Sequence, residues 1–347
     1  MTRISLRQLQ PDDGEALRGL FTLSPDDGRF AIAPQYQIDP YQIFVELGSN
    51  TTGVIAELPR TGEVVGVGLV DIQERYLAGA ISPCAFLHSL TVHPSYRRQG
   101  IATQLAKWRI DYARRQIGED VPILALIQKG NTGSMAAAQK WEAQTIGHCH
   151  NSLIRIRATP PDVPMGLTVR TAKDIELEQI ADSLNSFYQD YNLYIPQSRQ
   201  SLAEWLQKSP FVHPFRSYYV VVDEQENILA GLAVAEQYRV VTMHVQRMPG
   251  MVKLLNHIVK MVPPDGVLRQ LSINKIWFAP GRDAAARYLW EYVRWQMRDV
   301  GSHLVCSYDP LSPISAIIDP PFWLPKGTSV VVAHSSLVLD DRLVGYA

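Results

Sequence analysis

The stretch Phe86-Leu-His-Ser-Leu-Thr-Val-His-Pro-Ser-Tyr-Arg-Arg-Gln-Gly-Ile-Ala-Thr103 decides how the first half of the chain folds. It predicts a strand that runs into a short turn and then a helix, whose first turn contains a glycine. The early backbone N–H groups of a helix have no intrahelical partner and lie at the positive end of its dipole. From Gly100 to about Gln116 the helix is marked by apolar residues at helical spacing, namely Ile101, Leu105, Trp108, Tyr112 and Ile117.

The start of this helix has the composition of an anion site. Arg97 and Arg98 add two guanidinium groups to the free N–H groups, and Gly100 lets an anion approach the backbone with no Cβ in the way. The pattern differs from the GxxxxGK phosphate loop because it lacks the lysine–hydroxyl pair that serves a metal-bound nucleotide. It predicts a pyrophosphate site, and the alternative is an arginine-rich helix start that is merely solvated.

The elements around this stretch predict a mixed α/β domain. A hairpin signal, Pro-Arg-Thr-Gly, separates two β-rich segments before the motif, and a buried strand follows it. The predicted helices cover residues 12–22, 100–116 and 132–143, and the predicted strands cover residues 53–58, 63–73, 85–92, 121–127 and 145–157. This order places helices on both sides of one sheet.

The chain then repeats itself. Residues 159–166 contain three prolines, leave few backbone donors and predict an interdomain linker. Ile4-Ser-Leu-Arg7 recurs after it as Leu167-Thr-Val-Arg170, and Val64–Leu69 recurs as Leu229–Val234. Matches in the same order predict a duplicated domain. We expect two related domains, at residues 1–158 and 167–347.

The motif resembles that of the GNAT superfamily of N-acetyltransferases. The family signature is Arg or Gln, two residues, Gly, one residue, then Gly or Ala, and it is met by Arg97, Gly100 and Ala102. The family often has a cofactor-contacting Asn after the next strand, where this chain has Asn131 with Ser134. The resemblance is strong over about residues 84–135. It implies an α/β (α+β) fold in which each domain is a mixed, mostly antiparallel sheet flanked by helices, with a splayed cofactor cleft.

The resemblance also implies a reaction. Acetyl-CoA would be the co-substrate, with backbone groups of Leu90 and Val92 on the pantetheine arm and thioester, and the helix start on the pyrophosphate. We expect transfer of acetyl to a primary amine by direct attack in a ternary complex. The alternative is a non-catalytic acyl-CoA-binding or sensing protein. The implied cofactor-binding residues are Leu90, Thr91, Val92, Arg97, Arg98, Gln99, Gly100, Ile101, Ala102, Thr103, Asn131 and Ser134.

The catalytic candidate is His88. An amine with a pKa near ~10 costs about 4 kcal/mol to deprotonate at neutral pH, whereas a thiol near ~8.5 needs only about 2 kcal/mol of help in leaving, so the base matters more than the acid. Histidine is the side-chain type suited to general base catalysis near neutral pH, and the strand of His88 resembles that of the aralkylamine acetyltransferases. A buried core histidine is the other interpretation. Asp71 and Glu74 are the next candidates.

Two departures from the family pattern matter. Many members place a tyrosine acid about seven residues after the Asn, where this chain has Ala138, so we expect no dedicated tyrosine acid. In the second copy, Pro280-Gly-Arg-Asp-Ala-Ala-Ala286 replaces the motif, and Asp283 near the helix start would repel pyrophosphate. We expect a degenerate GNAT-like domain without CoA that helps to shape the acceptor groove or an interface. Residues 240–270 are predicted as an insertion that either lines such a groove or forms a plain helical packing surface.

Composition limits the partners. The 347 residues carry a net charge of −1, too little to attract nucleic acid or an anionic membrane by bulk charge. The three cysteines are widely spaced and predict a reducing compartment with neither a disulfide framework nor a metal site. No apolar run reaches the ~18 residues of a membrane span. We expect a soluble, cytoplasmic protein that acts on a small-molecule or peptide amine, and the sequence is compatible with an oligomer.

Overall fold

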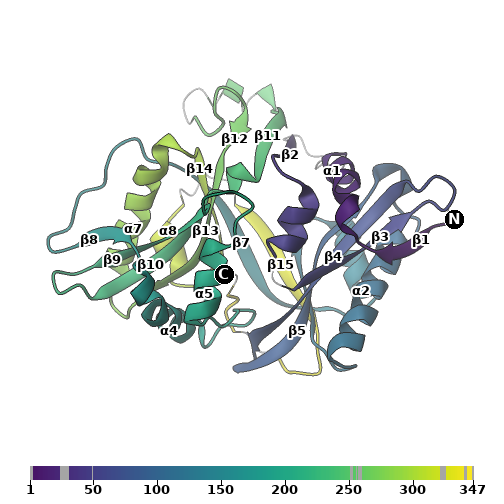
Figure 1. Ribbon diagram of the computed structural model, residues 1–347, viewed down its shortest axis with the longest axis horizontal. Coiled ribbons are helices and arrows are strands. Elements are labelled where there is room, and N and C mark those ends of the chain that lie inside the picture. The colour runs from purple at the N-terminus through teal and green to yellow at the C-terminus, as the bar shows by residue number, and fades with distance from the viewer. Residues whose placement is uncertain are drawn as a thin grey trace.

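The computed structural model describes residues 3–23, 31–48, 50–250, 253–254, 256, 260–320, 326–339 and 342–345. The described strands form one large sheet that runs through both halves and a small sheet, with helices on both faces of the large one (Figure 1). Two neighbouring pairs in the large sheet are parallel and the others are antiparallel. The predicted fold class, mixed and mostly antiparallel, is confirmed.

The first half contains every element that the sequence predicts, within a few residues at each end. Its elements are β1 (Ser5–Gln8), α1 (Gly14–Thr22), β2 (Ala31–Tyr36), β3 (Thr51–Glu57), β4 (Val64–Leu77), β5 (Ala80–Val92), α2 (Ile101–Ile117), β6 (Ile123–Gln128), α3 (Thr132–Gln139) and β7 (Gln144–Arg155). Strand β2 was not predicted, because its partner β11 lies some 200 residues away in the sequence.

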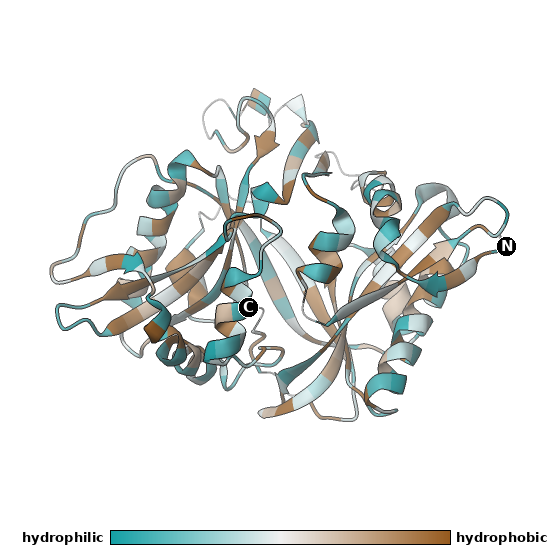
Figure 2. Ribbon diagram, in the orientation of Figure 1, coloured by the Kyte–Doolittle hydropathy of each residue, from teal (hydrophilic) through white to brown (hydrophobic). Residues whose placement is uncertain are grey.

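The second half repeats the order with an insertion. Its elements are β8 (Thr168–Thr171), α4 (Leu177–Tyr188), α5 (Arg199–Gln207), β9 (Arg216–Val222), β10 (Ile228–Ala235), β11 (Val241–Arg247), β12 (Val267–Leu268), β13 (Gln270–Phe278), α7 (Asp283–Gln296), β14 (His303–Tyr308), α8 (Ile314–Ile318) and β15 (Gly327–His334). Figure 2 shows apolar residues concentrated along the strands of the large sheet and polar residues on the outer faces of the helices.

The repeat extends to side-chain contacts. Arg7 binds the carboxylate of Asp13 at 2.7 Å, and the matched Arg170 binds Glu176 at 2.7 Å, six residues on in both halves. Each carboxylate also accepts a backbone N–H from three residues earlier, which joins the first strand to the following helix in the same way. The duplication inferred from short sequence matches is therefore present in three dimensions.

The two halves exchange their last strands. Strand β15, near the end of the chain, lies between β6 and β7 and pairs antiparallel with both. Strand β7, which ends the first repeat, pairs on its other side with β14 of the second. The hydrogen bonding of the sheet therefore crosses from one half to the other. The predicted domain boundaries at residues 158 and 167 describe the repeat in the sequence and stay a prediction.

Further contacts join the halves above and below this exchange. Strand β11 of the insertion pairs with β2, so residues 241–247 form a small sheet with the segment after α1. The end of β4 also meets the loop after α4, where the Tyr76 N–H donates to the Tyr194 carbonyl at 2.9 Å and the Leu193 N–H donates to the Tyr76 carbonyl at 2.7 Å. A shared apolar cluster contains Ile38, Ile43, Leu47, Phe211, Phe215, Ala235, Val240 and Val241.

Candidate acyl-CoA cleft and adjoining histidine

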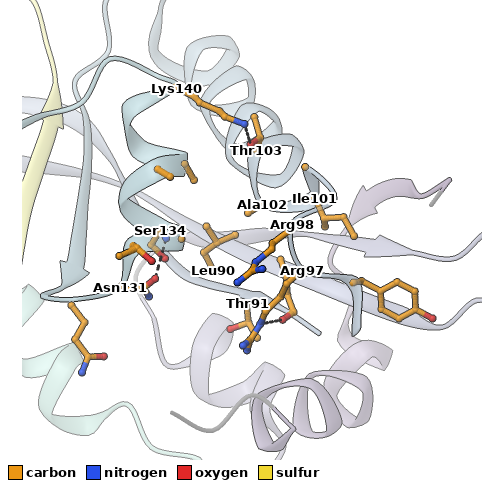
Figure 3. A pocket seen from close by; sticks show the side chains of 18 of the residues that line it. Leu90, Thr91, Arg97, Arg98, Ile101, Ala102, Thr103, Asn131, Ser134 and Lys140 are labelled. Atoms are coloured by element: carbon orange, nitrogen blue, oxygen red, sulfur yellow. Dashed lines mark hydrogen bonds between the residues drawn. The ribbon is translucent and has the colours of Figure 1, made fainter. Parts of the chain in front are cut away.

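The cleft arises where two parallel strands part. Strands β5 and β6 are paired from Ala85 and Ile123 only as far as Leu87 and Ala125, although both strands continue. Beyond this point a cavity of about 910 Å³ opens between them (Figure 3). Its lining residues come from the end of β5, the start of α2, the end of β6 and α3, and they are Leu90, Thr91, Val92, Tyr96, Arg97, Arg98, Gly100, Ile101, Ala102, Thr103, Gln128, Lys129, Gly130, Asn131, Thr132, Gly133, Ser134, Ala136, Ala137 and Lys140.

A bulge in β5 shapes the cleft wall. Val67 of β4 pairs with Thr91 and Leu69 pairs with His88, so Ser89 and Leu90 together oppose a single residue of β4. Ser89 adopts φ 49°, in the left-handed region that a non-glycine residue rarely enters. A bulge bends a strand and re-aims its side chains, and bulges are frequent beside active sites. This one turns the last residues of β5 toward the cavity.

The helix start has the geometry of an anion cradle. Gly100 is the N-cap of α2 with φ 80°, which a residue with a Cβ reaches only at a cost, and a Cβ there would meet nothing within 4 Å. Arg97 donates from Nε to the carbonyl of Val92 at 3.2 Å, which fixes the turn against β5. The first N–H groups of α2 therefore face open space on the cavity side.

The opposite wall is the start of α3. Asn131 is its N-cap, and its Oδ1 accepts the N–H of Ser134 at 3.0 Å. Figure 3 shows Arg97 and Arg98 across the cavity from Asn131 and Ser134. Eleven of the twelve residues that the resemblance implies for cofactor binding thus line one cavity, and Gln99 does not.

Sequence reasoning missed two cations of this wall. Lys129 and Lys140 line the cavity, and Lys140 donates from Nζ to Thr103 Oγ1 at 3.0 Å across the gap between α3 and α2. With Arg97 and Arg98 they place four cationic side chains around the cavity, and none of its described lining residues is acidic. The field in the cleft therefore favours a polyanion. Both lysines lie outside the signature, and only the fold brings the residue after β6 and the C-cap of α3 to the same cavity.

His88 lies on β5 just before the bulge and pairs with an acid on the neighbouring strand. Its Nε2 is 3.0 Å from Asp71 Oδ1 and its Nδ1 is 3.1 Å from Ser89 Oγ. Thr51 Oγ1 donates to the same Asp71 oxygen at 2.6 Å. The His88 side chain is 25% exposed, so it is reachable and not a core histidine. His88 does not itself line the cavity. Glu74, the other acidic candidate, is exposed to solvent.

The second half keeps the backbone plan of this cleft but fills it. Strands β13 and β14 are parallel and stop pairing at Ile273 and Cys306, and Lys275 at φ 52° marks a bulge. Ile276 occupies the position in this bulge that Leu90 occupies in the first half. Its carbonyl accepts a hydrogen bond of 2.8 Å from the Tyr188 hydroxyl. Asp283 is the first residue of α7, so a carboxylate lies at this helix start, as the sequence predicts.

Comparison with known proteins agrees with this geometry. Residues 17–142 match the model of the acetyltransferase (GNAT) family. The first half of the chain therefore contains a domain of the GNAT family. No curated protein sequence matches it.

Solved structures extend the likeness in fold over both halves of the chain. Saccharomyces cerevisiae N-myristoyltransferase with bound myristoyl-CoA superposes with a TM-score of 0.68 at 10% identity, covering 100% of this chain and 90% of that one. A tandem GNAT protein from the clavulanic acid biosynthesis pathway gives 0.61 at 14% identity over 96% and 98%. A GCN5-related N-acetyltransferase from Sphaerobacter thermophilus gives 0.59 at 14% identity over 95% of each chain. At such low identities these likenesses show the fold alone.

Two absences complete the description. In the described ranges, no three His, Cys, Asp or Glu side chains gather as metal ligands would. None of the helices in the described part of the chain is long and apolar enough to cross a bilayer.

Proposed function

We propose that this protein is an N-acetyltransferase that moves acetyl from acetyl-CoA to a primary amine by direct attack in a ternary complex. The observation that carries the proposal is one arrangement. A splayed cleft with a cationic helix-start cradle ends at a strand bulge, and the residue that precedes the bulge is a histidine paired with a carboxylate.

The cleft suits CoA in charge and in shape. The pyrophosphate would bind the free N–H groups at the start of α2 beside Arg97 and Arg98, as anions do at helix N-termini. The pantetheine arm would follow Leu90 to Val92, whose ladder to β6 has ended. An N–H group at the bulge would then face the thioester oxygen, where it stabilises the negative charge of the tetrahedral intermediate.

The closed end of the splay favours a short acyl group. On the far side of the bulge from the cavity lies the paired segment of β5 and β6. Its Phe86, Leu87 and Leu124 side chains are 4%, 4% and 0% exposed. The guanidinium of Arg75 lies 5.0 Å from the centre of the Phe86 ring and covers it. A two-carbon acyl group needs no space there, whereas a long chain would have to displace packed side chains.

His88 would act as the general base. An ionised Asp71 carboxylate can accept a hydrogen bond but cannot donate one, so it favours the His88 tautomer with the proton on Nε2. Nδ1 is then free to accept a proton beside Ser89 Oγ. The amine nitrogen bonds to the acyl carbon, its proton passes to Nδ1 directly or through the Ser89 hydroxyl, and the carbon–sulfur bond breaks. The CoA thiolate leaves and takes a proton from water, since Ala138 occupies the position of the tyrosine acid.

The three described cysteines are unpaired and buried, which supports our inference that the protein works in a reducing compartment such as the cytoplasm.

The test is CoA release from a panel of acyl-CoA donors and amines. We expect turnover with acetyl-CoA and at least one primary amine, and turnover that falls as the acyl chain lengthens. Saturable binding of acetyl-CoA without release of CoA for any amine, small or peptidic, would instead identify a binding or sensing protein. Faster turnover with a long-chain donor would overturn the acetyl assignment.

A further inference from the structure

A buried arginine lies directly behind the bulge. Arg109 of α2 is 2% exposed, and its recorded partners in the described chain are three backbone carbonyls. Its Nη1 donates to Leu69 of β4 and to His88 of β5, both at 3.1 Å, and its Nε donates to Leu105 at 3.1 Å. Burial without an acidic partner lowers the pKa of Arg109 to about 9.

The two sheet carbonyls are those where the ladder is interrupted. Leu69 and His88 form the last regular pair before the two-residue bulge. A buried carbonyl that leaves a ladder needs another donor, and a planar guanidinium can reach one on each strand with the same nitrogen. Arg109 therefore fixes the backbone on which the His88 imidazole and the Leu90 amide depend.

Gly68 leaves room for this contact. It is the single residue of β4 that faces the bulge, and a Cβ on it would lie 2.8 Å from Arg109 Nε. Such an approach is closer than carbon and nitrogen atoms tolerate. The buried guanidinium of Arg109 therefore fits only because Gly68 has no side chain.

The second half provides an internal comparison. Its bulge at Lys275 persists, yet the single residue that faces it is Leu232, where the first half has Gly68. Counting seven residues on from the matched Ala102 and Ala286, Val293 matches Arg109. Val293 is fully buried, and the carbonyl of Lys275 accepts a neutral donor, the hydroxyl of Tyr218, at 2.9 Å. A bulge of this kind therefore forms without an arginine from the following helix behind it, although the Lys275 side chain is itself buried there.

Burying a cation without an anion is costly, and apolar replacements of buried charges are often neutral or stabilising. Since the second bulge forms with Val293 in place of this arginine, the cost of burying Arg109 points to the site. We infer that Arg109 is a positioning residue of the acyl-transfer site, which holds the β5 bulge so that His88 faces Asp71 and the Leu90 amide faces the cleft. This inference rests on the proposed function.

The test compares Arg109→Met and Gly68→Ala with the parent, and uses Arg115→Met, an exposed arginine on the same helix, as the control. We expect both site variants to speed amide hydrogen exchange at residues 88–92 but not in β9 or β10. We expect kcat to fall about 10- to 100-fold, as a small misplacement of reacting groups does. The KM for acetyl-CoA should change by less than about threefold, because the cradle at α2 is untouched. Arg109→Lys should recover part of kcat.

Gly68→Ala keeps the guanidinium in the chain, so it decides the matter if Arg109→Met does not fold. Unchanged exchange at residues 88–92 together with unchanged kcat per folded molecule would overturn the inference, whatever the melting temperature. If the parent acetylates no amine, the exchange comparison still decides the positioning role. A failure of the proposed function is thus distinguishable from a failure of this inference.

Discussion

At the scale of single residues, the register of one hairpin brings together the proposed catalytic pair, His88 and Asp71. Asp71 is directly opposite Phe86 and Leu69 is opposite His88, so the acid and the histidine share a face of the β4–β5 hairpin. The sequence predicted both strands and named both residues, but not their contact, because a shift of one residue in register would place them on opposite faces. The bulge beside this pair is held by Arg109, whose hydrogen bonds to Leu69 and His88 join residues far apart in the sequence.

Replacing His88 with Ala should lower kcat by about 10²–10⁴ and leave acetyl-CoA affinity nearly unchanged. Raising the pH should partly restore the rate, because more of the amine is then free base. Asp71→Asn should cause a smaller loss, since it disturbs the tautomer and leaves the imidazole in place. Steady-state rates against pH, with the exposed His213→Ala as control, provide the measurement. A stable His88 variant with the parent's profile would remove His88 from the mechanism.

A second prediction at this scale concerns Lys275, which is buried against the Trp205 ring at 5.0 Å. Burial, aided by the nearby charge of Arg216, lowers its pKa from 10.5 to about 7. Between these values the unfolded chain holds a proton that the folded chain lacks, so this lysine makes stability rise with pH, by roughly 1 kcal/mol per unit. Below about pH 7 both states are charged, and the full cost of burial remains.

Lys275→Met should therefore be more stable than the parent at pH 6 to 7, and its advantage should shrink as the pH rises to 9. Urea unfolding at several pH values measures the difference, and the exposed Lys253→Met serves as the control. An advantage that stays constant with pH would mean that the lysine is not titrating in this window.

At the scale of elements, α2 shows how far the sequence could be read. Its start was predicted in detail, because the signature residues are contiguous and act through the backbone and through side chains at its surface. Its buried face was predicted less well. Trp108 and Tyr112, expected as apolar markers, stack on each other at 5.4 Å and remain partly exposed. Arg109 is buried in their place, because three backbone carbonyls satisfy it, and local periodicity contains no signal for that.

The two ends of α2 provide a matched pair of variants. Gly100 and Gly118 both have a positive φ, and a Cβ on either would meet nothing within 4 Å. Gly100→Glu and Gly118→Glu both strain the backbone, and the second should cost the more, because φ 138° with ψ 165° is a region essentially restricted to glycine. Only the first places a carboxylate in the cradle, where it repels pyrophosphate. Thermal stabilisation by CoA should be lost in Gly100→Glu and kept in Gly118→Glu. Equal stabilisation of the two variants would show that the cradle lies elsewhere.

At the scale of the whole molecule, the exchange of β7 and β15 was beyond the sequence. Both segments were predictable as β-rich, but a strand does not encode which neighbour it pairs with, and the duplication suggested two self-contained sheets. The exchanged strands join the apolar clusters of the halves. Val331 of β15 packs with Leu77 and Phe86 of the first half and with Leu193 of the second. Neither half completes its sheet without the other.

Because of this exchange, both halves should unfold in one cooperative transition. Fluorotryptophan labels report on each half separately, since Trp108 belongs to the first and the fully buried Trp290 to the second. In urea, their fluorine signals should change with the same midpoint. Two separated midpoints would mean that the halves are independent domains, as the linker at residues 159–166 first suggests.

The central claim is that acetyl-CoA binds the first cleft and not its filled counterpart. Amide hydrogen exchange of the full chain, with and without saturating acetyl-CoA, tests it most directly. We expect slower exchange at residues 90–92, 97–104 and 129–134, where β5, α2 and α3 line the cavity, and no change at residues 274–286. Protection at residues 274–286, or no protection around Gly100, would contradict the account.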